Sequence, residues 1–166
     1  MNYIMTLVSL FATDNAVKEY IETHVAQGTQ IPVLSGKICI KNHHNTGAMF
    51  HLGGKNRSLI ATISLVFSAF VSGIFAATLT TKGNVLLKSG LAILLGGAYS
   101  NTYDRLKRKY VVDYVSFRLP PAKNKALEKL KNALETIVFN ISDFGIIIGA
   151  MLIVTSEMFR REEKAS

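Results

Sequence analysis

The chain has 166 residues, of which 49% are hydrophobic and only 18% are charged, and its formal net charge is +8. The length suits one domain, and the high apolar content makes a membrane surface a better partner for the positive charge than nucleic acid. The single cysteine, Cys39, has no partner for an intrachain disulfide. We therefore predict one integral-membrane domain over residues 1–166 that binds no nucleic acid.

Four apolar segments predict an all-α membrane protein with four transmembrane helices. They cover about residues 3–25, 58–80, 85–100 and 137–159, and a span needs roughly 20 residues. The first could instead be a signal peptide, but it lacks a basic start and continues as an amphipathic helix. Four glycines in the third and fourth segments are expected to allow close helix packing: Gly96, Gly97, Gly145 and Gly149.

Two of the connections predict structure outside the bilayer. After the first helix, three β-prone runs separated by turn residues predict a small sheet: Ile31–Leu34, Lys37–Ile40 and Ala48–Leu52. After Pro120 and Pro121, apolar residues recur at helical spacing with lysines between them. This pattern predicts a basic amphipathic helix over about residues 122–134 that lies on the membrane surface.

Polar side chains gather on one side of the predicted bundle. Successive spans alternate in direction, so the end of the first helix, the loop after it, the end of the third and the start of the fourth share one membrane face. Seven residues fall there: Asp14, Asn45, Asn101, Asp104, Asp113, Asn140 and Asp143. An ionisable group such as Asp143 inside a membrane is costly, which makes it a functional hypothesis.

Local spacing leaves structural alternatives open. Asp14 and Lys18 are four residues apart on one helical face, where they form either part of a site or a structural ion pair. Asp104 with Arg105 is equally compatible with a helix cap.

Two sheltered carboxylates predict aspartyl protease chemistry. When close, they cannot both ionise cheaply, so they share one proton and titrate as a pair. The ionised member activates water while the protonated member polarises the scissile carbonyl. No nucleophile has to come from the protein in this chemistry, which fits the lack of GxSxG, HExxH and a Cys–His pattern in the chain.

Four blocks resemble the lipoprotein signal peptidase (signal peptidase II) family. "GGAYSNTYDRLKRKYVVDY" is similar to its "GGAxGNxxDRxxxGxVVDF" block, and "FNISD" to its "FNxAD" block. "NTGAMF" resembles "NxGAAF", and "DNAVK" resembles "DQxSK". The blocks follow the family's order from residue 14 to 149.

The resemblance implies a bacterial membrane endopeptidase that cuts a prolipoprotein just before its diacylglyceryl-modified cysteine. It implies a catalytic pair, Asp113 and Asp143, no cofactor, and inhibition by globomycin. The implied supporting residues are Asp14, Lys18, Asn45, Gly47, Asn101, Asp104, Arg105 and Asn140. It also implies a bacterial cell membrane location with both termini in the cytoplasm and the active site on the extracytoplasmic side.

The chain departs from the family pattern in several places. Ser100 and Lys109 replace glycines, Tyr114 replaces Phe and Ser142 replaces Ala, changes that we expect to affect substrate fit. The stretch between the two acids is long, and the amphipathic helix fills it.

Charge and motifs disagree about orientation. Residues 102–135 hold nine Lys and Arg against four Asp and Glu, which the positive-inside rule would place in the cytoplasm. We follow the family and expect this segment to contact anionic headgroups. Two rivals remain: a non-catalytic relative that binds lipidated peptides, and a metal-dependent lipid-headgroup transferase.

Overall fold

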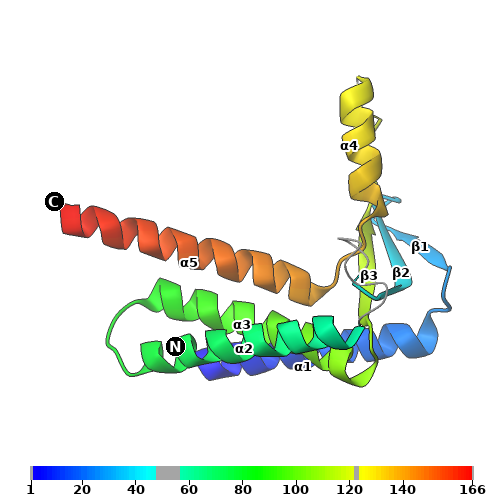
Figure 1. Cartoon of the computed structure of the whole chain (residues 1–166). Coiled ribbons are helices and arrows are strands. Elements are labelled where there is room, and N and C mark those ends of the chain that lie inside the picture. Colours follow the sequence, from blue (N-terminus) through cyan, green and yellow to red (C-terminus); the bar gives the residue numbers. More distant parts are fainter. Residues whose placement is uncertain (1, 48–56, 122–123, 166) are drawn as a thin grey trace.

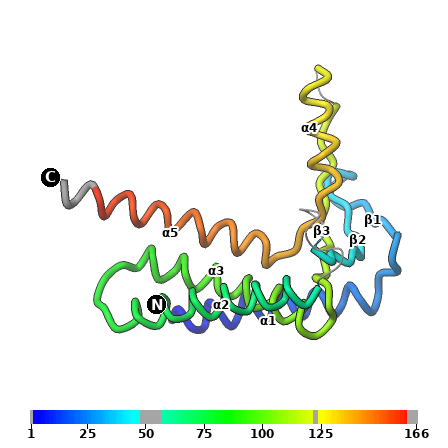
Figure 2. The backbone as a smooth tube through the Cα atoms, in the orientation of Figure 1, coloured from blue at the N-terminus to red at the C-terminus, as the bar shows by residue number. Residues whose placement is uncertain are grey.

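Helices make up most of the structure, a computed structural model that describes residues 2–47, 57–121 and 124–165, with side chains up to residue 161. In chain order the elements are α1 (Tyr3–His24), β1 (Gln30–Val33), β2 (Ile38–Asn45), α2 (Arg57–Leu79), α3 (Val85–Lys107), β3 (Val111–Phe117), α4 (Lys125–Thr136) and α5 (Ile141–Ala165). Helices α1, α2, α3 and α5 run along one another, and the sheet and α4 lie at one end of them (Figure 1). Figure 2 traces the same path and shows both termini toward the opposite end.

Helix α3 packs against each of α1, α2 and α5. Its glycines permit this, because a Cβ on Gly90 would lie 2.8 Å from the Gly149 carbonyl oxygen of α5. A Cβ on Gly96 would lie 2.9 Å from the Leu7 carbonyl oxygen of α1, and one on Gly97 would meet the Ser142 carbonyl oxygen. A Cβ on Gly145 would meet the Leu10 side chain of α1 at 2.7 Å. Small residues let helix backbones approach closely, so the predicted packing role of Gly96, Gly97, Gly145 and Gly149 is confirmed, and Gly90 shares it although it was not predicted.

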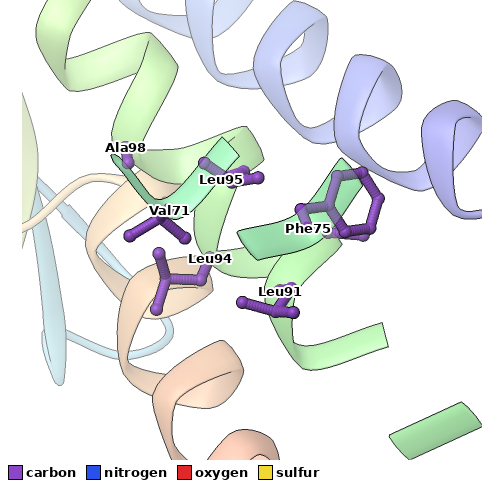
Figure 3. Close-up of a cluster of buried hydrophobic side chains, with 7 residues drawn as sticks. Val71, Phe75, Leu91, Leu94, Leu95 and Ala98 are labelled. Atoms are coloured by element: carbon purple, nitrogen blue, oxygen red, sulfur yellow. The ribbon is translucent and has the colours of Figure 1, made fainter. Parts of the chain in front are cut away.

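An apolar cluster joins α2 to α3. Val71 and Phe75 of α2 pack against a run of α3 residues, drawn in Figure 3: Leu91, Leu94, Leu95 and Ala98. Other large side chains of α2 point outward, and Phe70 is 67% exposed. Outward apolar surface of this kind is expected of a helix that faces lipid.

Two of the described helices are long and apolar enough to cross a membrane: α2 and residues 141–161 of α5. Helices α1 and α3 carry more ionisable residues, including Asp14 and Lys18 in α1 and Asp104 and Arg105 in α3. These four side chains are wholly or partly buried against neighbouring elements. Four spans therefore remain our prediction.

The sheet is antiparallel, in the order β1-β2-β3. Ile31 pairs with Ile40, and His43 pairs with Asp113 after an irregularity in β2 between Ile40 and His43. The first two predicted runs are strands, although β2 continues to Asn45; the third, Ala48–Leu52, lies outside the described residues. Strand β3 was not predicted, although its β-branched and aromatic residues favour strand structure.

Candidate active site

Asp113 lies in the middle of β3, with 2% of its surface exposed. Both of its carboxylate oxygens have amide partners from other elements. Asn45 of β2 donates from Nδ2 to Oδ2 at 2.9 Å, and Asn140 donates from Nδ2 to Oδ1 at 2.7 Å. The carboxyl group is therefore held in one orientation away from bulk water.

Asp143 lies in the first turn of α5 and forms a capping box with Asn140. The Asp143 amide donates to Asn140 Oδ1 at 2.9 Å, while the Asn140 amide donates to Asp143 Oδ2 at 3.0 Å. This reciprocal pair satisfies two backbone donors that a helix start otherwise leaves free. The other oxygen, Oδ1, accepts from Nδ2 of Asn101 on α3 at 3.0 Å.

Asn140 thus binds both acids, one through its side-chain amide nitrogen and the other through its backbone and its amide oxygen. The two carboxylates are close enough to interact electrostatically. Burial, reinforced by the negative charge of Asp143, raises the pKa of Asp113 from 3.8 to about 7. Asp113 therefore keeps a proton at a pH where an exposed aspartate has lost it.

Lys18 is fully buried behind the pair and orients Asn101. Its Nζ donates to Asn101 Oδ1 at 2.8 Å, and it also lies 2.8 Å from Asp14 Oδ2 and 3.1 Å from Asp104 Oδ2. Because the Lys18 ammonium group donates to the amide oxygen of Asn101, the amide nitrogen of Asn101 points toward Asp143. The predicted Asp14–Lys18 pair is confirmed, and it reaches the site through Asn101.

Three departures from the family pattern converge on Asp14. Ser100 and Ser142 donate to its Oδ2 at 2.6 Å and 2.5 Å, and Tyr114 donates to its Oδ1 at 2.8 Å. In the family pattern these positions are Gly, Ala and Phe, which have no hydroxyl. The sequence suggested an effect on substrate fit, but these hydroxyls contact a buried carboxylate. The sequence did hold one signal for this role: each of the three hydroxyl residues stands next to a predicted site residue, namely Asn101, Asp113 or Asp143.

Asp104 does not simply cap a helix with Arg105. Its partners are Lys18, Arg108 Nη1 and the backbone amide of Val112, which donates to Oδ2 at 3.2 Å. Asp104 therefore joins the end of α3 to the start of β3, one residue before Asp113.

Arg105 and Gly47 complete the predicted set. Arg105 is half-buried, donates to the Asn101 carbonyl oxygen at 3.2 Å and interacts electrostatically with both Asp113 and Asp143. The Gly47 amide donates to Asn45 Oδ1 at 2.9 Å, which leaves the Asn45 amide nitrogen to face Asp113. Gly47 has a φ of +89°, a conformation that glycine adopts readily.

The predicted polar residues therefore do meet at one end of the helices, as expected from the alternating direction of successive spans. Within the part of the chain that the structure describes, no three His, Cys, Asp or Glu side chains gather as a metal site would require.

The fold and the site define a helical membrane protein with a pair of close carboxylates at one end of its helices. The chain belongs to the signal peptidase II family, since the family's sequence model, described as "Signal peptidase (SPase) II", matches residues 6–159. It is therefore a peptidase.

Named relatives and solved structures agree. The chain is 30% identical over 168 residues to the lipoprotein signal peptidase of Shouchella clausii (strain KSM-K16), covering 100% of this chain and 99% of that one. It is 28% identical to the lipoprotein signal peptidase of Mesorhizobium japonicum, covering 96% and 88%. Two bacterial membrane enzymes solved by the in meso method, at 2.3 Å and 1.9 Å, share the fold, with TM-scores of 0.75 and 0.73. They are 22% and 20% identical, covering 98% and 93% of this chain and 90% of each of theirs.

Proposed function

We propose that this chain removes the signal peptide from prolipoproteins by cutting just before the diacylglyceryl-modified cysteine, with Asp113 and Asp143 as the catalytic pair. One observation carries the proposal: Asn140 binds both carboxylates of a signal peptidase II chain at once, within 2.7 Å of Asp113 and 3.0 Å of Asp143. Such an arrangement holds the two acids near each other before substrate binds.

The two acids have different surroundings, which supports different roles. Asp113 is buried in the sheet and keeps its proton up to about pH 7. Asp143 lies at a helix N-terminus, where the Asn140 amide donates to its carboxylate and the helix dipole favours a negative charge. We therefore assign the proton of the resting pair to Asp113.

The reaction then follows in two steps. Asp143 takes a proton from a water molecule, and the water oxygen forms a bond to the scissile carbonyl carbon. At the same time Asp113 donates its proton to the carbonyl oxygen. The tetrahedral intermediate collapses when Asp143 gives its proton to the leaving nitrogen of the cysteine and the C–N bond breaks. Asp113 recovers its proton from the intermediate, so the pair returns to its starting state.

The remaining predicted residues are positioning residues in this proposal. Asn45, fixed by Gly47, and Asn140 hold Asp113, while Asn101, fixed by Lys18, holds Asp143. Asp14 and Asp104 balance the charge of Lys18. Arg105 lies near both acids and is suited to bind the peptide carbonyl of a substrate.

We further propose that α1, α2, α3 and α5 all span the bacterial cell membrane, with the pair on the extracytoplasmic side. Polar residues of α1 and α3 then face each other and the sheet, and the outward side chains of α2 face lipid. The lipidated cysteine would reach the pair at the membrane surface. Globomycin-type inhibitors are expected to compete for the same site.

The test is cleavage of a purified prolipoprotein by the reconstituted chain. We expect cleavage only of the diacylglyceryl-modified form, with a new N-terminal cysteine, and the same rate with and without a chelator. Binding of the lipidated form without cleavage would support a non-catalytic relative. Activity lost to the chelator would support a metal-dependent enzyme. Either result would overturn the proposal.

A further inference from the structure

Helix α4 is an appendage of the fold. Every one of its residues is at least partly exposed, and its main contact with another element is with β3. Figure 1 shows it extending away from the helices and running across the direction of α5. Its start is fixed by Asn124, whose side chain accepts from the Leu127 amide at 2.9 Å.

The helix turns its polar side toward the protein. The partly buried residues of α4 are Glu128, Lys131 and Glu135, which recur at helical spacing on one face. Glu135 also ties the helix to the chain after β3, because its Oε1 accepts from the Leu119 amide at 2.8 Å. A helix of a water-soluble domain normally buries its apolar face instead.

The apolar side of α4 is left open. Leu127, Leu130 and Leu134 form one stripe and are 50%, 56% and 42% exposed. The exposed Ala126 and Ala133 widen this stripe on one side. With 3.6 residues per turn, Lys129 and Lys131 lie on the two borders of the widened stripe. An apolar stripe bordered by lysines is the pattern of a helix that lies in a membrane interface.

The position of α4 also favours a membrane. It ends at Thr136, and only four residues separate it from the start of α5, one of the two clearly apolar helices, at Ile141. The C-terminal end of α4 therefore lies close to the point where the predicted span α5 begins. A helix that crosses the direction of α5 at this level runs along the membrane surface.

We propose that α4 docks on an anionic membrane leaflet, with its leucine stripe among the lipid headgroups and upper acyl chains and the bordering Lys129 and Lys131 bound to lipid phosphates. The inference depends on the membrane position of α5 and not on the chemistry of the acid pair. It gives the basic segment 102–135 a lipid partner, so that its charge does not require a cytoplasmic location. Docking would also steady the short link that carries Asn140.

The chain has no tryptophan, so one introduced tryptophan can report on α4 without background. We would reconstitute full-length Leu130→Trp, on the leucine stripe, and Asn132→Trp, on the opposite face, as a matched control. The nanodiscs would contain phosphatidylcholine alone or mixed with phosphatidylglycerol, with brominated lipid as quencher. We expect a blue shift and quenching for the first variant only, stronger with phosphatidylglycerol. Adding Lys129→Gln and Lys131→Gln, the two lysines that border the stripe, should remove that increase.

Two results would overturn the inference. If brominated lipid leaves Leu130→Trp unquenched in every mixture, the stripe faces water, a second copy or another protein. If quenching does not depend on phosphatidylglycerol, the lysines do not bind anionic lipid. Prolipoprotein cleavage by the same variants is a separate measurement, so failure of the catalytic proposal would not be mistaken for failure of docking.

Discussion

Asp113 differs from an exposed aspartate because it is buried and lies near a second carboxylate. Its pKa of about 7 has two causes, burial first and then the charge of Asp143. Asn45 and Asn140 oppose the shift by donating to its oxygens. In the proposed mechanism, Asp113 is the acid that keeps its proton and Asp143, at a helix start, is the acid that loses it.

This difference predicts the pH dependence of cleavage. As pH rises through about 7, Asp113 loses its proton and the pair has no acid left to polarise the carbonyl. We expect kcat/KM to fall roughly tenfold per pH unit above that point. A rate that stays constant well into the alkaline range would show that no proton on Asp113 is needed.

At the scale of elements, much of the architecture could be predicted from hydrophobic patterning. The helices, two strands of the sheet and the convergence of polar residues follow from periodicity and from counting crossings. Strand β3 was missed because Asp113 and the preceding basic residues made its segment resemble a polar loop. The hydroxyls around Asp14 were also missed, because Asp14 lies 86 residues from Ser100 and 128 from Ser142, separations that local spacing cannot bridge.

Contact between α3 and α5 sets the position of Asp143. A substitution at Gly97 can therefore test how precisely Asp143 must be positioned. A Cβ on Gly97 would press on the Ser142 carbonyl, one residue before Asp143. We expect Gly97→Ala to lower kcat roughly tenfold to a hundredfold. Gly73→Ala is the matched control, because a Cβ there meets nothing within 4 Å. Equal activity of the two variants would mean that this contact does not position the acid.

At the scale of the whole molecule, one buried charge cluster joins elements that are distant in sequence. Lys18 of α1 contacts residues of α3, and Asp14 of α1 contacts α3, α5 and β3. Removing one member of a buried cluster leaves the opposite charge without compensation. The same cluster that holds the helices together also orients Asn101 toward Asp143.

Lys18→Met is therefore expected to reduce the free energy of unfolding by about 3–5 kcal/mol, because Asp14 and Asp104 lose their shared cation. Thermal unfolding in detergent would measure the change. Lys88→Met is a useful comparison, since Lys88 is also buried but donates to the Thr81 carbonyl oxygen rather than to a carboxylate. Similar losses in the two variants would argue against a charge cluster that supports the fold.

The central claim is that Asp113 and Asp143 act together. It is tested most directly by the single-turnover cleavage rate of a lipidated prolipoprotein by Asp113→Asn and Asp143→Asn. Glu157→Gln, which changes a partly exposed acid paired with Arg160, serves as the control for loss of one negative charge. We predict that each Asn variant still binds substrate but cleaves it about 1,000-fold more slowly or worse, while the control is unaffected. Cleavage by either Asn variant within about tenfold of the unchanged chain would contradict the account.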